Sequence, residues 1–333
     1  VSVFWLQAAV DLPFTGSSSE ANNIIINSAI SNNKNEEYLF SSQEHPSVYN
    51  LANKLLLEGK KVKFIPSSKD GFIDVDSLLN LINDNTKFVS LINVSNETGA
   101  INKVNEIAKK IKEINPKTLI HSDGVQALGK IKVDVSNLDF YTISSHKIYG
   151  LKGIAGFYCK NIKSLKPFII GGGQEFNIRS GTTNAPMIFS LLDAVSNAVC
   201  NQKTNFDKVL NLNVFLRERL KRLDNVVINS PNLNNEPNQE NYSCSPYVLS
   251  VSILGLNAET IQNMLSKKEI YVGLGSACSA KKSGNRVLES MNKSKSEILG
   301  NLRISLSKNT TKEEIITFCN ELENCIKILR GNL

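Results

Sequence analysis

The stretch Ile143-Ser144-Ser145-His146-Lys147-Ile148-Tyr149-Gly150 decides how this chain is interpreted. One apolar run, residues 140–143, precedes it and another, residues 153–158, follows, so the sequence predicts a turn between two short strands. A lysine in such a turn, Lys147, is expected near the interior, where a desolvated amine can be neutral enough to attack a carbonyl group. The alternative is an ordinary surface lysine after a strand.

A second polar segment, 24 residues upstream, favours the reactive lysine. Asp123 comes at the end of a predicted strand that begins with the apolar residues 118–120. A pyridoxal phosphate (PLP) site requires a lysine that binds the aldehyde of the cofactor and an aspartate that pairs with its pyridinium nitrogen. We therefore expect Lys147 and Asp123 to hold PLP.

Short motifs follow one another along the chain, and each of them alone is a weak signal. They are Thr15 to Asn23, Glu44-His45-Pro46, Ser95 to Gly99, Asp123 to Gln126, Ser144 to Gly150, Arg179 to Thr182 and Gly275 to Ser279. In this order they closely resemble the cysteine desulfurases of the NifS/IscS type, which are PLP enzymes (fold type I) of the class V aminotransferase family. The resemblance covers roughly residues 14–330.

Strands alternate with helices from Tyr38 to Tyr158, which predicts a mostly parallel sheet in an α/β layer. Residues 88–94 form a continuous apolar run, as expected of a parallel strand that is covered on both faces. The resemblance implies the PLP-dependent transferase fold, like that of aspartate aminotransferase, with a mostly parallel seven-stranded sheet and a small α+β C-terminal domain. We expect a large PLP-binding domain at residues 1–186 and a small domain at residues 187–333, which carries the catalytic cysteine loop and a short strand at residues 270–272.

Ligands of parallel sheets bind at the carboxyl ends of strands, where the sequence places four polar side chains: His45, Asn96, Asp123 and Ser144. The resemblance implies that His45 stacks on the pyridine ring. It places Asn96 beside the phenolic oxygen and the substrate carboxylate, and it assigns Gln126 to the phenolic oxygen. His146 is a candidate for proton transfer or for a phosphate contact.

The loop Gly16 to Ser19 precedes a stretch of helical composition, residues 20–30. Such a loop offers unpaired N–H groups to a phosphate, and the alternative is a plain helix cap at Ser19. The resemblance favours phosphate, because a threonine usually stands at the position of Ser19. The implied phosphate contacts are Ser19, Ser144 and Thr182, and Ser18 and His146 are further expected cofactor contacts.

Cys278 lies in a segment rich in glycine, serine and lysine, residues 273–284, which we expect to be mobile and exposed. Cys159, Cys200 and Cys319 lie on apolar stretches and are expected to be buried and inert. The resemblance implies that Cys278 takes sulfur from the PLP-bound substrate as a persulfide and passes it to an acceptor. It also implies that Arg303 binds the substrate carboxylate, which suits its planar fork.

The implied reaction converts L-cysteine into L-alanine and transfers its sulfur to Cys278 and then to an acceptor protein. The sulfur's destination, iron–sulfur clusters or thiolated products, stays open. Lys147 would move the proton of the substrate Cα, with His45 and His146 as further catalytic residues. Thr182 is implied to reach the phosphate of a neighbouring subunit's cofactor, so we expect a homodimer with shared sites.

Composition limits the other classes of function. The chain has 333 residues, 41% hydrophobic and 21% charged, with no apolar run near the ~20 residues of a membrane span. Its net charge of +7 is scattered, so we expect no direct nucleic-acid binding. The six cysteines contain no C-x-x-C pair, which predicts no metal site and favours a reducing cytoplasm.

Two alternatives stay open. One is a selenocysteine lyase or another class V PLP enzyme; a cysteine on an exposed loop argues against an aminotransferase. The other is a truncated, non-catalytic scaffold for sulfur transfer, because the Asp-Asn-Ala-Ala-Thr-like strand of the family has no match ahead of Phe14 and the beginning is interpreted as truncated or divergent.

Overall fold

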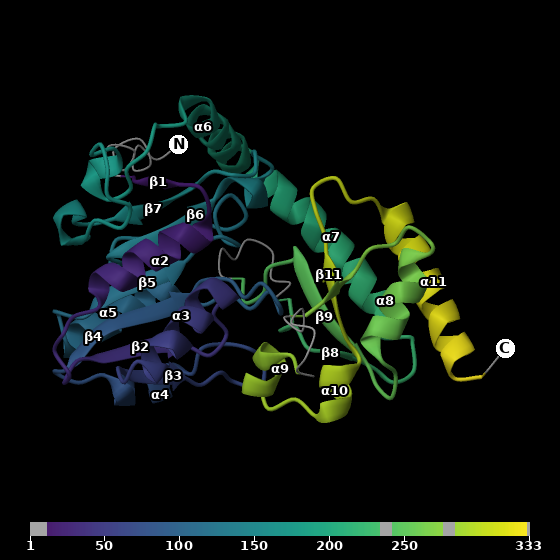
Figure 1. Cartoon of the computed structure of the whole chain (residues 1–333). Helices are drawn as coiled ribbons and strands as arrows, with labels where there is room; N and C mark the ends of the chain where they lie inside the picture. The colour runs from purple at the N-terminus through teal and green to yellow at the C-terminus, as the bar shows by residue number, and fades with distance from the viewer. Residues whose placement is uncertain (1–11, 234–241, 276–283, 332–333) are drawn as a thin grey trace. The chain divides into compact units, whose positions relative to one another are not determined.

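The computed structural model describes residues 12–233, 242–275 and 284–331, which form two compact units (Figure 1). The first unit comprises the chain up to Pro66 together with Ile73–Val94 and Asn102–Gln202. The second comprises Ser67–Phe72, Ser95–Ile101 and the chain from Lys203 onward. The division between residues 186 and 187 stays a prediction.

Within the described residues, the first unit is built on a seven-stranded sheet of order β1-β7-β6-β5-β4-β2-β3. Strands β2 to β6 pair in parallel, and β7 is antiparallel to both of its neighbours. This confirms the expected mostly parallel sheet. The strands are β1 (Phe14–Thr15), β2 (Glu37–Ser41), β3 (Lys61–Ile65), β4 (Thr86–Ile92), β5 (Leu119–Asp123), β6 (Phe140–Ser144) and β7 (Ala155–Cys159).

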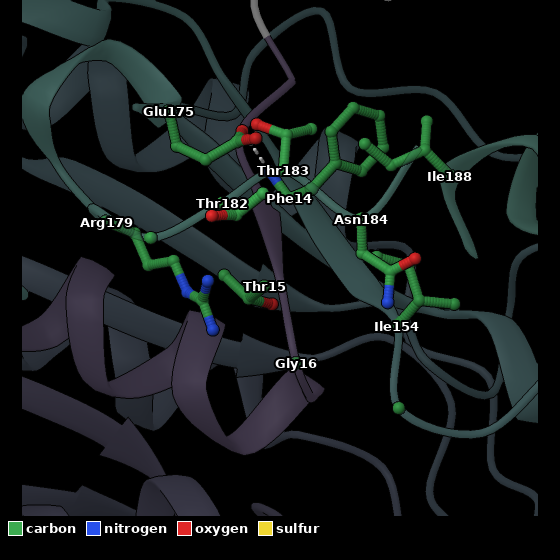
Figure 2. Close-up of a pocket in the computed structure, with 12 residues that line it drawn as sticks. Phe14, Thr15, Gly16, Ile154, Glu175, Arg179, Thr182, Thr183, Asn184 and Ile188 are labelled. Carbon is green, nitrogen blue, oxygen red and sulfur yellow. Dashed lines mark hydrogen bonds between the residues drawn. The ribbon is translucent and has the colours of Figure 1, made fainter. Parts of the chain in front are cut away.

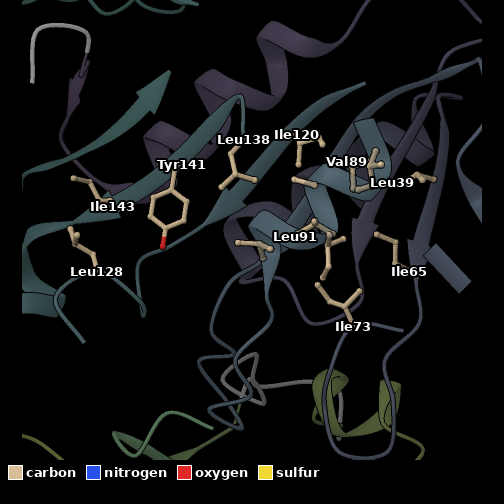
Figure 3. Close-up of a cluster of buried hydrophobic side chains, with 14 of the residues drawn as sticks. Leu39, Ile65, Ile73, Val89, Leu91, Ile120, Leu128, Leu138, Tyr141 and Ile143 are labelled. Atoms are coloured by element: carbon tan, nitrogen blue, oxygen red, sulfur yellow. The ribbon is translucent and has the colours of Figure 1, made fainter. Parts of the chain in front are cut away.

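Both faces of this sheet are covered, which explains why its strands are continuous apolar runs. Adjacent residues enter different cores: Phe88 packs with helices α2 and α3, whereas Val89 packs with α4 and α5 (Figure 3). The helices are α2 (Ser18–Ala29), α3 (Pro46–Leu57), α4 (Val75–Leu81), α5 (Val104–Ile114) and α6 (Ala185–Cys200), with 3₁₀ turns η2 (Ser145–Ile148), η3 (Ile162–Ser164) and η4 (Glu175–Asn177).

The second unit holds a four-stranded antiparallel sheet of order β10-β11-β9-β8 among its described residues. Helices follow the strands along the chain, as expected for a small α+β domain. The elements are α7 (Gln202–Leu220), β8 (Val226–Ile228), β9 (Val248–Ile253), α8 (Ala258–Ser266), β10 (Gly273–Leu274), α9 (Arg286–Ser290), α10 (Lys295–Leu299), β11 (Asn301–Ser305) and α11 (Lys312–Leu329).

The structure corrects three local expectations. Helix α2 is capped by Ser17, not by Ser19, because the extended Ser17 accepts a hydrogen bond from the N–H of Glu20, three residues later. The short strand expected at residues 270–272 lies instead at β10, where the chain pairs with β11. Cys200 is exposed rather than buried, since it ends α6 on a different side from the buried Leu191 and Ala194.

Candidate active site

Asp123 is the last residue of β5 and is 6% exposed. Its Oδ1 accepts a hydrogen bond from the N–H of Val125 (3.1 Å), and its Oδ2 accepts one from Asn22 Nδ2 (3.1 Å). Burial raises the pKa of Asp123, while His45 and these hydrogen bonds act in the opposite direction. Both hydrogen-bond donors described for this carboxylate are uncharged, so it is suited to a cationic ligand atom.

Lys147 lies in the 3₁₀ turn η2, directly after β6, the strand that pairs with β5. The turn ends at Tyr149 in the left-handed region (φ 68°), and the N–H of Gly150 returns to the carbonyl of Ser145 (3.0 Å). Glycine is required at position 150 because a Cβ there would lie 2.1 Å from Ser145 Oγ. Lys147 is exposed, contrary to the expectation of an interior position.

Positive charge gathers around this turn. Burial lowers the pKa of Lys130 to about 7, with the Lys147 charge as the second cause. Burial also lowers the pKa of His146, followed by the charges of Lys147, Lys152 and Lys130. His146 Nδ1 lies 2.9 Å from Ser144 Oγ. This donor set fits an anionic phosphate, and the buried Asp123 fits a pyridinium nitrogen, so the residues present suit PLP.

Gln126 is oriented by a lysine that the sequence analysis did not single out. Lys130 Nζ donates to Gln126 Oε1 at 2.7 Å, across one turn of the chain. Because the oxygen of this amide accepts from Lys130, its N–H groups remain to donate toward a phenolic oxygen. The spacing of four residues from Gln126 was the only sequence signal for Lys130.

His45 is the N-cap of α3 and is exposed. Its Nδ1 accepts from the N–H of Ser47 (3.2 Å) and lies 2.9 Å from Ser47 Oγ, which in turn accepts from Asn22 Nδ2 (2.9 Å). Asn22 therefore connects the loop of His45 with Asp123. Asn22 lies within the recognised motif Thr15 to Asn23, but nothing in the sequence alone assigned it a role.

The other predicted phosphate contacts lie at the start of α2 and on the loop before α6. Ser18 and Ser19 begin α2, whose entry is fixed by the hydrogen bond from Gly16 N–H to Glu20 Oε2 (2.8 Å) and by the ion pair of Glu20 with Arg179 (2.8 Å). Thr182 is exposed and lines a cavity of about 210 Å³ beside β1 (Figure 2). The lining residues described for this cavity do not include Lys147, Asp123 or His45.

In the second unit, the predicted substrate residues Asn96 and Arg303 meet at Glu97. Arg303 Nη1 donates to Glu97 Oε1 (2.9 Å) and to the carbonyl of Asn96 (3.4 Å), and Asn96 Nδ2 donates to the same Oε1 (2.9 Å). Burial raises the pKa of Glu97, while Arg303 and Arg286 lower it. Gly273 pairs with Arg303 in the ladder, and a Cβ there would lie 3.2 Å from two guanidinium nitrogens.

Cys278, the predicted nucleophile, lies outside the described residues. So do residues 1–11, which contain most of the segment interpreted as truncated or divergent. Among the described residues, no group of three or more His, Cys, Asp or Glu side chains could hold a metal ion. No helix in the described ranges is long and apolar enough to cross a membrane.

Comparisons with known proteins show the family of this chain. The model of the aminotransferase class-V family matches residues 4–318. The chain is 32% identical to a cysteine desulfurase, IscS, of Dictyoglomus turgidum over 96% of this chain and 80% of that relative. It is 34% identical to IscS of Rickettsia prowazekii, over 92% and 73% of the two chains.

Solved structures give the same result. A NifS-like protein superposes with a TM-score of 0.85 at 30% identity, covering 96% of this chain and 83% of the other. A NifS-like protein from Rickettsia africae superposes with a TM-score of 0.80, also at 30% identity, covering 95% and 82% of the two chains.

Proposed function

This chain belongs to the class-V aminotransferase family and is a PLP-dependent cysteine desulfurase, and we propose that Lys147, Asp123 and Cys278 carry its chemistry. The observation that carries the residue assignment lies at two neighbouring strand ends. There, β5 ends in the buried carboxylate of Asp123, and the turn after β6 bears Lys147 among further cations. A carboxylate and a cationic group at adjacent strand ends complement the two polar ends of PLP.

When bound, the cofactor supplies an electron sink that allows L-cysteine to lose its Cα proton. Asp123 would hold the pyridine nitrogen in its protonated form. Lys147 would hold the cofactor covalently, and its amine would move the Cα proton of the substrate. His45 would contact the ring, and Gln126, positioned by Lys130, would donate to the phenolic oxygen.

Phosphate binding is assigned to the N-terminus of α2 and to the turn after β6. Ser18 and Ser19 lie in the first turn of α2, where backbone N–H groups have no helical partner. Ser144 and His146, linked at 2.9 Å, add side-chain groups beside the charges of Lys130 and Lys147.

Arg303 and Asn96 bind the substrate carboxylate. Glu97 fixes one guanidinium nitrogen of Arg303 by the 2.9 Å ion pair. The side chain of Arg303 is still 30% exposed, so further donors of its planar fork remain for a carboxylate. Asn96 is held against the same glutamate and is placed next to Arg303 in this way.

Cys278 accepts the sulfur. Its thiolate attacks the sulfur of the substrate, an S–S bond forms while the C–S bond breaks, and the Cβ of the departing alanine takes a proton. The resulting persulfide passes its outer sulfur to an acceptor protein. The names of the relatives favour iron–sulfur cluster assembly as the destination. We place the protein in the cytoplasm, where free thiols such as those of its described cysteines persist.

The protein is proposed to be a homodimer. Large apolar side chains of the first unit are exposed on the turns around β7, on the segment before α6 and on α6 itself: Tyr149, Leu151, Phe168, Ile169, Ile170, Phe176, Phe189 and Leu192. So much exposed apolar surface favours association. A second copy would cover it and would give Thr182 access to a neighbouring phosphate. Light scattering should give the mass of two chains.

The decisive experiment measures sulfide and alanine release from L-cysteine by the PLP-loaded protein. Borohydride reduction should attach the cofactor to the peptide containing Lys147. Cys278→Ser should keep the cofactor absorption yet release almost no sulfide, because a serine hydroxyl stays protonated near neutral pH. Cys200→Ser is the matched control, since Cys200 is an exposed cysteine outside this chemistry. Wild-type sulfide release by Cys278→Ser would refute the proposed sulfur transfer.

A further inference from the structure

A row of buried polar side chains crosses the sheet of the first unit and ends at Asp123. Ser90 on β4, His121 on β5 and Thr142 on β6 are all 0% exposed, and so is Asn22 on α2. The contacts run from Ser90 to His121 (2.9 Å), to Thr142 (3.0 Å), to Asn22 (2.7 Å) and to Asp123 (3.1 Å). Polar groups are costly in a sheet core, so an unbroken row of them needs a reason.

The direction of each hydrogen bond follows from the number of available protons. The two N–H bonds of Asn22 go to Asp123 Oδ2 and Ser47 Oγ, so Asn22 Oδ1 must accept, and Thr142 donates its only proton there. The flipped amide would place its oxygen against the carboxylate. Asn22 thus uses both donors and its acceptor, which fixes its orientation.

The same count extends to the histidine. Since Thr142 has spent its proton, its oxygen accepts from His121 Nε2–H. Burial lowers the pKa of His121 to about 3, so the ring is neutral near pH 7 and its Nδ1 carries no proton. Ser90 Oγ lies 2.9 Å from this Nδ1 and donates its one proton to Glu44 Oε1 (3.0 Å). Each donor in the row, from His121 onward, therefore points toward Asp123.

We propose that His121, Thr142 and Asn22 are positioning residues that keep Asp123 ionised and oriented for the pyridine nitrogen of the cofactor. This inference rests on the proposed role of Asp123. Burial alone would favour the neutral acid, which could not hold a protonated pyridine. Aligned N–H and O–H dipoles polarise one another and place their positive ends at the carboxylate, which offsets the desolvation.

The chain offers a matched control on the same strand. Ser122 lies between His121 and Asp123, is 0% exposed, and its hydroxyl has no hydrogen-bond partner in the described structure. Ser122→Ala therefore removes a buried hydroxyl next to Asp123 without touching the row. Thr142→Val removes the donor and keeps the shape of the side chain, whereas Thr142→Ser keeps the donor.

The test is nitrogen-15 NMR of the holoprotein loaded with PLP labelled at the pyridine nitrogen, because this chemical shift reports protonation directly. Wild type, Ser122→Ala and Thr142→Ser should show the protonated position. Thr142→Val and Asn22→Ala should shift toward the unprotonated position, and their apoproteins should bind PLP about three- to tenfold more weakly. Asn22→Ala keeps the test valid if Thr142→Val fails to fold, which thermal unfolding of the apoprotein detects.

If Thr142→Val and Asn22→Ala both keep the wild-type nitrogen-15 chemical shift and the wild-type PLP affinity, the inference is overturned and the proposed function stays intact. An unprotonated pyridine in the wild-type protein would instead overturn the role of Asp123, and this inference with it. If Ser122→Ala changes the nitrogen-15 chemical shift as much as Thr142→Val does, any buried hydroxyl near Asp123 has this effect, and the inference is also overturned.

Discussion

Two buried carboxylates, one in each unit, are held in different ways. Glu97 is 3% exposed and is paired with a guanidinium of its own unit, Arg303, at 2.9 Å. Asp123 is 6% exposed, and both of its described hydrogen-bond donors, the backbone of Val125 and the amide of Asn22, are uncharged. Neighbouring charge acts on it through His45.

This difference indicates that the two carboxylates have different roles. The folded chain already neutralises Glu97, so that carboxylate serves to orient Arg303. Asp123 is supported by neutral dipoles and stays able to attract a ligand cation, which is the property that a PLP site needs. Removing the cationic partner of Glu97 should therefore lower the stability of the apoprotein, whereas removing the charge of Asp123 should raise it.

The largest effect is expected on activity when Asp123 is changed. Asp123→Asn should lower the rate of sulfide release about 100-fold or more, because an amide cannot hold the pyridine nitrogen protonated. The measurement is steady-state turnover of the PLP-loaded variant. Asp70→Asn, at an exposed turn position, is the control and should keep wild-type activity. Near-normal turnover in Asp123→Asn would remove the distinction between the two carboxylates.

The ion pair of Glu97 should affect the stability of the protein. Arg303→Gln leaves Glu97 buried without its cation and should reduce the free energy of unfolding of the apoprotein at pH 7 by about 2 kcal/mol. This is less than the 3–5 kcal/mol of a fully buried pair, since Arg303 is 30% exposed. Removing Arg303 raises the pKa of Glu97 further, so the loss should be full well above pH 4.5 and vanish below it, where the glutamate is protonated in both states.

Chemical unfolding at pH 4 and pH 7 measures this difference, and the exposed Arg222→Gln is the control. An equal loss at both pH values would show that Arg303 stabilises its unit by packing rather than by its charge.

A smaller effect on stability, of the opposite sign, is expected when Asp123 is changed in the apoprotein. Because burial raises the folded-state pKa of Asp123 above 3.8, its charge costs stability that grows as pH rises from about 3.8 through the raised value. The Asp123→Asn apoprotein lacks this cost. Its melting temperature relative to wild type should therefore increase between pH 4 and pH 7, and a difference independent of pH would contradict the expected burial penalty.

The smallest expected effect concerns the cations around the turn that bears Lys147. Lys130→Met removes one of the charges that lower the pKa of His146, so this pKa should rise slightly. The chain has only three histidines, which makes an NMR titration readily assignable. Lys132→Met is the control, because Lys132 is not among the charges that act on His146. An unchanged His146 pKa in Lys130→Met would place Lys130 outside the phosphate environment.

Local sequence determined most of the fold. Continuous apolar runs predicted the central strands because both faces of a parallel sheet are buried, and β4 follows the run at residues 88–94 to within two residues at each end. Asp123 and Ser144 were placed at strand ends by the same runs. The helix cap considered at Ser19 lies two residues earlier, at Ser17. Three consecutive serines can each cap a helix, and only the backbone geometry selects Ser17.

Tertiary structure alone decided what surrounds the reactive groups. Asn22 meets Asp123 across 101 positions of the chain, and Arg303 meets Glu97 across 206. The sequence marked Asp123, Lys147 and Arg303 by residue type and motif, whereas Lys130 and His121 carried no comparable signal. The physical reason is that hydrogen-bond partners and desolvation arise from side chains packed through the sheet, and local periodicity records only which side of a strand or helix is buried.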